Sequence, residues 1–356
     1  MPDSGTDPSA ATSDGAVRSG EQFRDDLRCA TGRVLPAEVL GELTSLSTSR
    51  SVIAVSRTLL VILAVVIATT LVVTGSVAAS QWSWLWVIIP AIFIVATQQH
   101  ALFVLAHEAA HYRLFPNRRV NDLIGRLLAA SVGLSMCSYR VVHRLHHNHL
   151  YGDQDPDIAL HGGYPRGKAY LVRKLVADVF GLTAWKTYRY FLGSPAANVN
   201  TGVAQRPLDD TLPALRQAAR NDRWLVAGVQ LGLPVCIVML FGWEGFAMYV
   251  LLWIVPAITV LQAILRVRAI CEHGAPSGYD SALQAARTTI VGPVLRFALF
   301  PHHVNYHIEH HLYPAVPQYN LARLHAELTQ RGILSAAEVR SFGATWRRVF
   351  APPAMS

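Results

Sequence analysis

Two long stretches of the chain consist almost entirely of apolar and uncharged residues. Residues 58–107 contain no Asp, Glu, Lys or Arg, and residues 224–265 contain only one, Glu244. A helix needs about 20 apolar residues to cross a bilayer, so each stretch has room for two spans. The pattern predicts four membrane-spanning helices in two hairpins, near residues 58–79, 84–105, 224–242 and 246–265.

A short turn separates the two members of each predicted hairpin. The turns are Ala-Ser-Gln-Trp at 79–82 and Gly-Trp-Glu-Gly at 242–245. Aromatic rings favour the membrane interface, and five tryptophans lie near the ends of predicted spans: Trp82, Trp84, Trp86, Trp224 and Trp243. Long buried helices in a soluble enzyme are the alternative, and these Trp-flanked apolar pairs favour the membrane.

The cations indicate the orientation of the spans. The chain of 356 residues carries 31 Lys plus Arg against 23 Asp plus Glu, a net charge of +8. Neither short turn contains Lys or Arg; the N-terminal arm, residues 106–223 and the C-terminal segment hold them. The positive-inside rule predicts that these three regions are cytoplasmic. No basic run is interleaved with stacking aromatic residues, which argues against a nucleic-acid partner.

The remaining segments complete the predicted organisation. Residues 1–34 are polar, with no apolar signal sequence, and we expect a disordered tail. Residues 35–330 form the membrane domain, and residues 331–356 a cytoplasmic C-terminal tail. Residues 121–137 are too short and polar for a span and predict an interfacial helix. The four cysteines form no Cys-x-x-Cys pair, which excludes a disulfide framework or thiolate zinc site.

Three short histidine clusters lie beside the ends of these predicted spans. They read His-Glu-Ala-Ala-His at 107–111, His-Arg-Leu-His-His at 143–147 and His-Ile-Glu-His-His at 307–311. Spacings of three or four residues place the imidazoles on one face of a helix, one turn apart. The predicted metal ligands are His107, His111, His143, His146, His147, His307, His310 and His311. His273, just beyond the fourth span, is a single histidine, and its role stays open on the residues alone.

The number of histidines indicates the kind of centre. Structural zinc takes four ligands, and catalytic zinc takes three and a water. Eight or nine imidazoles instead suit two metals with four or five nitrogens each. Imidazole also binds copper, nickel and zinc, but iron is the redox-active choice for reducing dioxygen. A dry crevice at a membrane suits oxidation of an unactivated alkyl C–H bond.

Three alternatives remain open on the residues alone. His107-Glu108-Ala-Ala-His111 matches the His-Glu-x-x-His pattern of zinc proteases, although that reading leaves the other two clusters unexplained. A haem would need only two facing histidines. A metal transporter would need polar ligands within the spans, where His100 is the only histidine and Glu108 lies beyond them.

Other polar residues near the clusters receive lesser roles. His100, His149, His161 and His325 are interpreted as ordinary interfacial groups, and His302 and His303 stay unassigned because they break the spacing of the third cluster. Acceptors for imidazole N–H groups are expected to orient the ligands. The candidates for this supporting role are Glu108, Asp153, Asp155, Asp157 and Asn305.

At these residues the chain resembles the membrane fatty acid desaturase and hydroxylase superfamily, of the bacterial type. That family carries His-x-x-x-His, then His-x-x-His-His twice, in this order. Residues 147–157 (His-Asn-His-Leu-Tyr-Gly-Asp-Gln-Asp-Pro-Asp) and 305–314 (Asn-Tyr-His-Ile-Glu-His-His-Leu-Tyr-Pro) extend the resemblance beyond the ligands. It implies an all-α integral membrane protein with four spans in two hairpins, a cytoplasmic helical cap and a histidine-held di-iron centre. It also implies His273, just after the fourth span, as an additional metal ligand. Ala269 stands where some relatives place a further Asn.

The resemblance also implies the reaction and its partners. Two Fe²⁺ ions per chain, dioxygen as co-substrate and two electrons would convert an alkyl chain to an alkene; hydroxylation is the alternative outcome. No fused cytochrome motif occurs, so the expected electron donor is a separate ferredoxin, cytochrome or reductase. The expected substrate is an acyl lipid, acyl-CoA, acyl carrier or small amphiphile, at the bacterial inner membrane.

Overall fold

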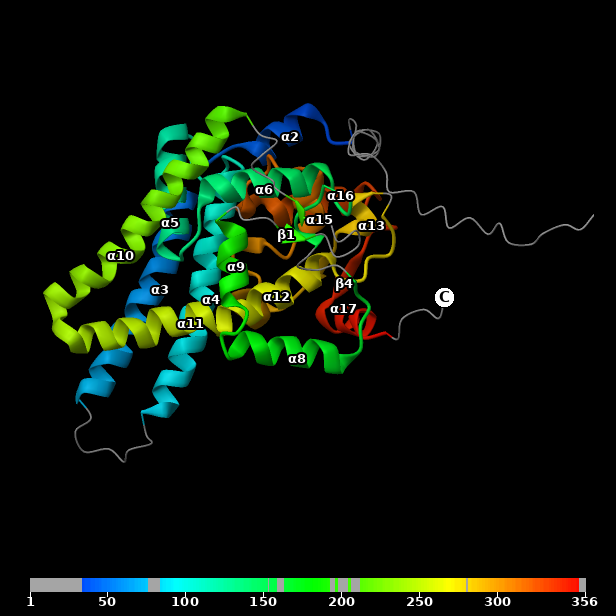
Figure 1. Cartoon of the computed structure of the whole chain (residues 1–356). Coiled ribbons are helices and arrows are strands. Elements are labelled where there is room, and N and C mark those ends of the chain that lie inside the picture. Colours follow the sequence, from blue (N-terminus) through cyan, green and yellow to red (C-terminus); the bar gives the residue numbers. More distant parts are fainter. Residues whose placement is uncertain are drawn as a thin grey trace, which may run out of the picture.

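The computed structural model describes residues 34–75, 84–152, 154–158, 163–192, 196–197, 204–205, 212–279 and 281–351. These residues are mainly helical (Figure 1). Three segments are long and apolar enough to cross a membrane: α3 (Thr48–Gly75), α4 (Leu85–Ala110) and the run Pro213–His273. The prediction of a helical protein with several membrane-spanning candidates is therefore confirmed. The first predicted turn, with Trp82, lies outside the described residues.

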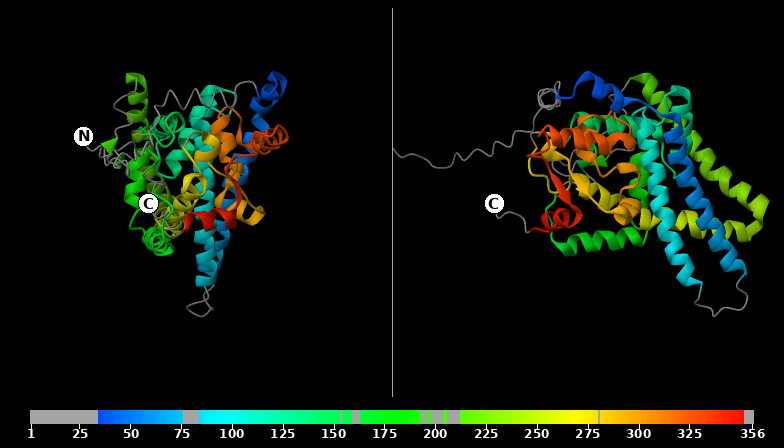
Figure 2. Two further views of the ribbon diagram at one scale, coloured as in Figure 1. Left: turned by 90° about the vertical axis from the view of Figure 1, so that its right-hand side faces the viewer. Right: turned by 180° about the vertical axis from the view of Figure 1, so that it is seen from behind.

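Helix α4 is the central helix of the molecule. Within the most apolar 18-residue stretch of each segment, 67% is buried in α4, against 11% in α3 and 6% in Pro213–His273. Figure 2 shows α3 and α4 side by side, extending beyond the other elements. The outer helices expose Leu71, Met239 and other large apolar side chains. Such a surface is unfavourable in water and is accounted for by lipid.

The run Pro213–His273 is one continuous path with a sharp bend. It comprises α10 (Pro213–Tyr249), a π-helical turn (Val250–Ile254), α11 (Val255–Ile258) and α12 (Val260–His273). Gly242 has φ 65° and ψ −166°, a backbone conformation open mainly to glycine. This residue is the first of the predicted second turn, and Figure 1 shows the chain changing direction between α10 and α11.

A proline explains the irregular backbone between α10 and α11. Pro256 has no N–H for the carbonyl four residues earlier, and its ring crowds that carbonyl. The π-helical turn immediately before it widens the backbone, which relieves such crowding.

The expected interfacial helix at 121–137 is two helices instead of one. α5 (Arg118–Ser131) begins at Asn117, whose side chain accepts from the next backbone N–H groups, and α6 (Met136–Asn148) follows at 98°. Gly133 has φ 78°, and the N–H of Leu134 donates to the carbonyl of Ala129. This left-handed glycine cap ends α5 and turns the chain. Counted as one bent span, the pair would make a fourth crossing.

Short elements fill the space beside one end of α4. The helices are α2 (Ala37–Thr44), α8 (Lys168–Val179), α9 (Ala184–Phe191), α13 (Ala282–Ala285), α14 (Pro293–Leu299), α15 (His307–Leu312), α16 (Leu321–Gln330) and α17 (Phe342–Val349), with 3-10 turns η2 (Pro301–His303) and η3 (Gln318–Asn320). Strands β1 (Ala196–Ala197) and β2 (Ala204–Gln205) pair antiparallel, and β3 (Thr288–Ile290) and β4 (Val339–Ser341) pair parallel.

The segment after residue 330 packs into the main body. β4 pairs with β3, and α17 contacts α12. The buried guanidinium of Arg287 lies 3.3 Å from the carboxylate of Glu338 and donates to the carbonyl of Cys271. These contacts join residues that are far apart in the sequence, and no local pattern indicates them. For that reason the sequence alone predicts a separate tail here.

The approach of α5 to α4 generates a testable prediction. A Cβ at Gly125 would lie 2.2 Å from the Cβ of Ala109 and 2.5 Å from the Sδ of Met136. Gly125→Ala should therefore lower the thermal unfolding midpoint in detergent, because overpacking costs about 1–3 kcal/mol. Gly232→Ala, in α10 with nothing within 4 Å, should keep or raise the midpoint. Equal midpoints for the two variants would contradict this packing.

Candidate metal centre

The structure gathers nine histidines into two groups, each with its possible ligand atoms within 4.8 Å of one another. Cluster A consists of His107, His111, His143, His147 and His310, and cluster B of His146, His273, His307 and His311. All nine histidines predicted as ligands lie in these two clusters. Imidazoles are their only donors, which fits two nitrogen-ligated metal ions.

Helical geometry distributes each histidine motif between the clusters. α6 directs His143 and His147, four residues apart, to cluster A, and His146 to cluster B. α15 does the reverse, with His307 and His311 in cluster B and His310 in cluster A. Each successive residue rotates by about 100° around a helix, so a His-x-x-His-His motif bridges two adjacent sites.

The ring nitrogens approach to distances typical of ligands sharing one metal. The Nε2 atoms of His107 and His143 are 2.8 Å apart, and those of His147 and His310 are 3.0 Å apart. In cluster B, the Nε2 of His307 lies 2.7 Å from that of His273. Two nitrogens at right angles around a metal, each about 2.1 Å away, are about 3 Å apart. The Nε2 of His111 is buried without a hydrogen-bond partner, as expected of a ligand atom.

Burial favours the neutral form, which coordinates metals, in most of these imidazoles. Burial, followed by the charge of Arg113, lowers the pKa of His111 to about 3. Burial and the neighbouring imidazoles also lower the pKa of His310 and His311 well below the usual value. A neutral ring keeps its lone pair available for a metal. His146 differs, because the carboxylates of Asp155 and Asp157 outweigh burial and raise its pKa to about 9, so a metal at this ring competes with a proton.

Oxygen atoms behind the rings orient cluster B. The Nδ1–H of His146 donates to Asp155 at 2.9 Å, and Asp157 lies 3.8 Å from the same nitrogen. The Nδ1 of His273 faces the carbonyl of Ala285 at 3.1 Å. Asp155 and Asp157 therefore lie where the sequence analysis expects supporting acceptors, and such contacts set the tautomer of a ligating imidazole.

The other expected acceptors that the structure describes make their hydrogen bonds to groups other than the clustered imidazoles. Glu108 lies 3.5 Å from the Nδ1 of His107, but its carboxylate accepts from the backbone N–H of Gln318 at 2.9 Å. The side chain of Asn305 donates to the carbonyl of Thr289 and so braces β3 instead of an imidazole. Asp153 lies outside the described residues.

Glu272 is a buried acceptor that was not predicted from the sequence. Its carboxylate lies 3.7 Å from the Nδ1 of His307 and also accepts a hydrogen bond from the Nε of Arg268 at 2.7 Å. The four-residue spacing of this buried pair and its position next to His273 are local signals that could have indicated it.

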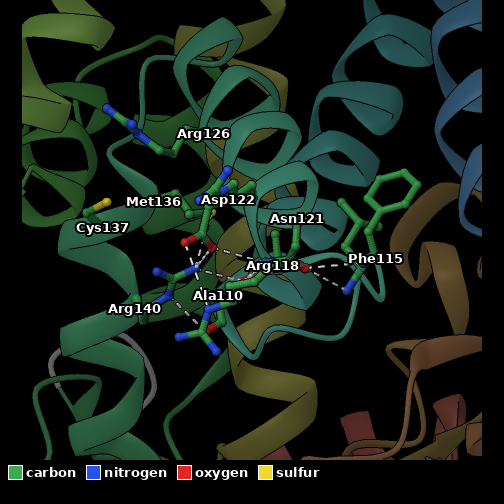
Figure 3. A network of polar contacts seen from close by, with 12 residues as sticks. Ala110, Phe115, Arg118, Asn121, Asp122, Arg126, Met136, Cys137 and Arg140 are labelled. Carbon is green, nitrogen blue, oxygen red and sulfur yellow. Dashed lines mark hydrogen bonds and ion pairs between the residues drawn. The ribbon is translucent and has the colours of Figure 1, made fainter. Parts of the chain in front are cut away.

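A polar network fixes the end of α4 that carries His107 and His111 (Figure 3). The side chain of Asn121 accepts from the backbone N–H groups of Leu114 and Phe115 and donates to the carbonyl of Ala109. From α6, Arg140 donates to the carbonyls of Ala109 and Ala110 and to Asp122 at 2.7 Å. Unpaired carbonyls at a helix end are thereby satisfied, and α4, α5 and α6 are held in one arrangement.

The two clusters differ in their access. His111, His143 and His147 line a groove of about 630 Å³ that also includes Arg140 and Arg144. Cluster B is fully buried and adjoins a cavity of about 90 Å³, whose lining includes Phe103, Leu265 and Ala269.

Histidines without a predicted ligand role lie outside both clusters. His325 donates to Glu309 at 2.5 Å, and the Nε2 of His302 lies 3.2 Å from the hydroxyl of Thr58. Both ring nitrogens of His100 are buried without a hydrogen-bond partner. His161 lies outside the described residues.

A helical protein with paired imidazole clusters beside apolar helices is the class that this fold and site define. A model of the family described as fatty acid desaturase matches residues 82–338. The chain belongs to the fatty acid desaturase family, which is part of a membrane di-iron superfamily. Membership confirms the resemblance inferred from the histidine motifs.

Curated relatives carry out more than one reaction. A β-carotene ketolase of Paracoccus sp. (strain PC1) is 30% identical over 226 residues, covering 62% of this chain and 72% of the relative. A dihydrorhizobitoxine desaturase of Bradyrhizobium elkanii is 28% identical over 250 residues, covering 66% and 65%. A chloroplastic omega-3 fatty acid desaturase of Glycine max is 26% identical over 271 residues, covering 70% and 56%.

The contact between His146 and Asp155 predicts a metal-retention phenotype. Asp155→Asn should weaken metal binding about 10–100-fold, because outer acceptors orient the ligand and raise its basicity. Metal remaining after dialysis against graded chelator measures the loss. Asp157→Asn is the matched control in the same turn, where the longer distance of 3.8 Å predicts a smaller effect. Equal retention by wild type and Asp155→Asn would refute this role.

Proposed function

We propose that the protein is a membrane di-iron oxidoreductase that uses O₂ and two electrons to desaturate an alkyl or acyl chain. The observation that carries this proposal is the pair of abutting all-imidazole clusters, five nitrogens beside four. In this proposal the nine histidines hold two Fe²⁺ ions. Bound iron would supply the reduction of dioxygen beside the cavity that includes Phe103 and Leu265 in its lining.

The protein's own residues prepare the site for that chemistry. The imidazoles of clusters A and B supply lone pairs without bringing compensating negative charge. Asp155 holds the Nδ1 proton of His146, so that ring can only present its Nε2. Burial of cluster B excludes water. The side chains of Phe103 and Leu265 can orient an apolar substrate chain beside this cluster. Exclusion of water limits the leakage of oxidant.

The contacts of Glu108 favour this function over a zinc protease. In the protease pattern, the Glu between the two histidines acts as general base on a metal-bound water. Here the Glu108 carboxylate is near the Nδ1 of His107, whereas the Nε2 of that ring faces His143. The carboxylate therefore lies behind the ligand ring, hydrogen-bonded to Gln318.

The membrane arrangement that we propose follows the charges. The run Pro213–His273 would form two spans that meet at Gly242, giving four spans in two hairpins with α3 and α4. Its bend coincides with a segment that contains no Lys or Arg. The positive-inside rule then places the histidine clusters and both termini on the cytoplasmic side of a bacterial inner membrane.

The substrate and electron donor belong to the same proposal. The apolar helices and the lipid desaturases among the relatives support an acyl lipid, acyl-CoA, acyl carrier or small amphiphile as substrate. The name of one relative includes ferredoxin, which supports a separate ferredoxin, cytochrome or reductase as donor. Oxygen insertion is the second candidate reaction, favoured by the similarity to β-carotene ketolases.

Expression in a defined host tests the reaction directly. Mass spectrometry of lipids and soluble metabolites should reveal a product lighter by two hydrogens, dependent on O₂ and reductant. A product heavier by one oxygen would assign the oxygenase instead. An iron-loaded, reduced enzyme that forms neither product from candidate acyl substrates would refute the proposed activity.

The ligand assignment has its own test. His310→Ala should abolish activity and lower the iron content, measured per chain by elemental analysis, because one of the five nitrogens of cluster A is lost. His325→Gln is the matched control: it replaces a histidine outside the clusters while keeping a donor for Glu309. Full activity and two irons in His310→Ala would remove this ligand from the set.

A further inference from the structure

A cavity of about 490 Å³ lies between α3, the α14–η2 segment and η3, apart from both histidine clusters. None of the nine clustered histidines lines it. Its cationic wall contains Arg50, Arg57 and Arg296, and His302 and His303 also line the cavity. Its apolar wall includes Ile53, Val61 and Phe297. A recess with these two walls fits a molecule that joins an anion to a hydrocarbon.

The guanidinium groups of this cavity have no carboxylate partner among the described residues. Within the described part of the chain, Arg57 and Arg296 form no ion pair, and no Asp or Glu lines the cavity. Arg50 donates to the side-chain oxygen of Asn320 at 3.1 Å, a neutral partner. The Nε of Arg296 and the Nδ1 of His303 are buried without hydrogen-bond partners. Buried donors without acceptors cost free energy, and an anion in the cavity would satisfy them.

The electrostatic environment of His303 indicates that these cations converge. Burial, followed by the charges of Arg296 and Arg57, lowers the pKa of this imidazole. Both guanidiniums are therefore close enough to the ring to disfavour a further positive charge. A neutral His303 can donate one hydrogen bond while the arginines supply the charge, a combination suited to phosphate.

The position of the cavity along α3 indicates where the ligand comes from. Arg57 is the last charged residue before the stretch 58–107, which contains no Asp, Glu, Lys or Arg. Beyond it, Leu60, Leu63 and Leu71 of α3 are exposed apolar side chains. The cavity thus lies at the boundary between the polar and apolar parts of a candidate span, where bilayer phosphates lie.

We propose that this cavity binds the phosphate of an anionic phospholipid, with an acyl chain lying along the apolar surface of α3. Arg57 and Arg296 contact the phosphate oxygens, and Phe297 and Val61 contact the part of the acyl chain nearest the phosphate. Free phosphate would leave the apolar wall in water, so a lipid fits the cavity better. This site does not depend on the proposed oxidation, because it shares no residue with the metal clusters.

Native mass spectrometry of the purified full-length protein in detergent tests the proposal. Wild type is titrated with dioleoyl phosphatidylglycerol, with dioleoylglycerol, which lacks phosphate, and with phosphatidylglycerol plus inorganic phosphate. Wild type should retain phosphatidylglycerol but not dioleoylglycerol, and equimolar inorganic phosphate should not displace the lipid. The double variant Arg57→Gln/Arg296→Gln should bind phosphatidylglycerol at least about tenfold more weakly, since two charge-assisted contacts are lost.

Arg119→Gln is the matched control, because Arg119 is an exposed arginine at the start of α5, away from the cavity. It should bind phosphatidylglycerol as wild type does. If the double variant does not fold, Arg57→Gln alone, at an exposed position on α3, carries the test. Unchanged affinity in the folded variant, equal retention of dioleoylglycerol, or displacement by equimolar phosphate would each overturn the proposal.

Discussion

The close approach of imidazole nitrogens from four helices is the constraint on which the rest of the structure depends. α4, α6, α12 and α15 bring nine rings into two adjacent groups, with nitrogen-to-nitrogen distances near 3 Å. Lone pairs that face one another without water are unfavourable by themselves. The surrounding packing and hydrogen bonds must therefore hold these rings in place, and a metal turns their convergence into a favourable interaction.

The polar network around α4, α5 and α6 supplies much of that support. Arg140 and Asn121 bind the carbonyls at the end of α4, within one turn of the clustered His107 and His111. Asp222 of α10 joins the same region, since it accepts from Arg126 at 2.6 Å and from the hydroxyl of Ser135. Charges in this part of the protein are thus paired with one another beside the apolar helices, where unpaired charge is unfavourable.

Local patterns in the sequence predict the parts of this fold that have a local cause. Continuous apolar runs predicted α3 and α4, and histidines three and four residues apart predicted the ligand faces of α6 and α15. The position of Gly242 in the predicted turn matches the bend of α10, because glycine accepts a conformation that other residues avoid. The resemblance to a known family brought His273 into the set, since a single histidine has no local signature.

The parts that escaped prediction arise from contacts between distant residues. The bend between α5 and α6 depends on Gly133, but nothing nearby indicates that α6 then packs on α10. The division of the histidines into five and four follows from how four helices are placed, not from any one motif. Glu272 was missed because a buried carboxylate becomes recognisable only with its partners, Arg268 and His307, in view.

The parallel pairing of β3 with β4 has a consequence for how the protein matures. β3 lies between two ligand-bearing segments: Thr288 donates to Glu309 on α15, and Arg287 binds carbonyls at the end of α12, beside His273. Its partner β4 begins only at Val339. The ribosome must therefore synthesise nearly the whole chain before cluster B has its complete support. Under the proposed function, cluster B would therefore bind its metal late, after α3 and α4 have been synthesised.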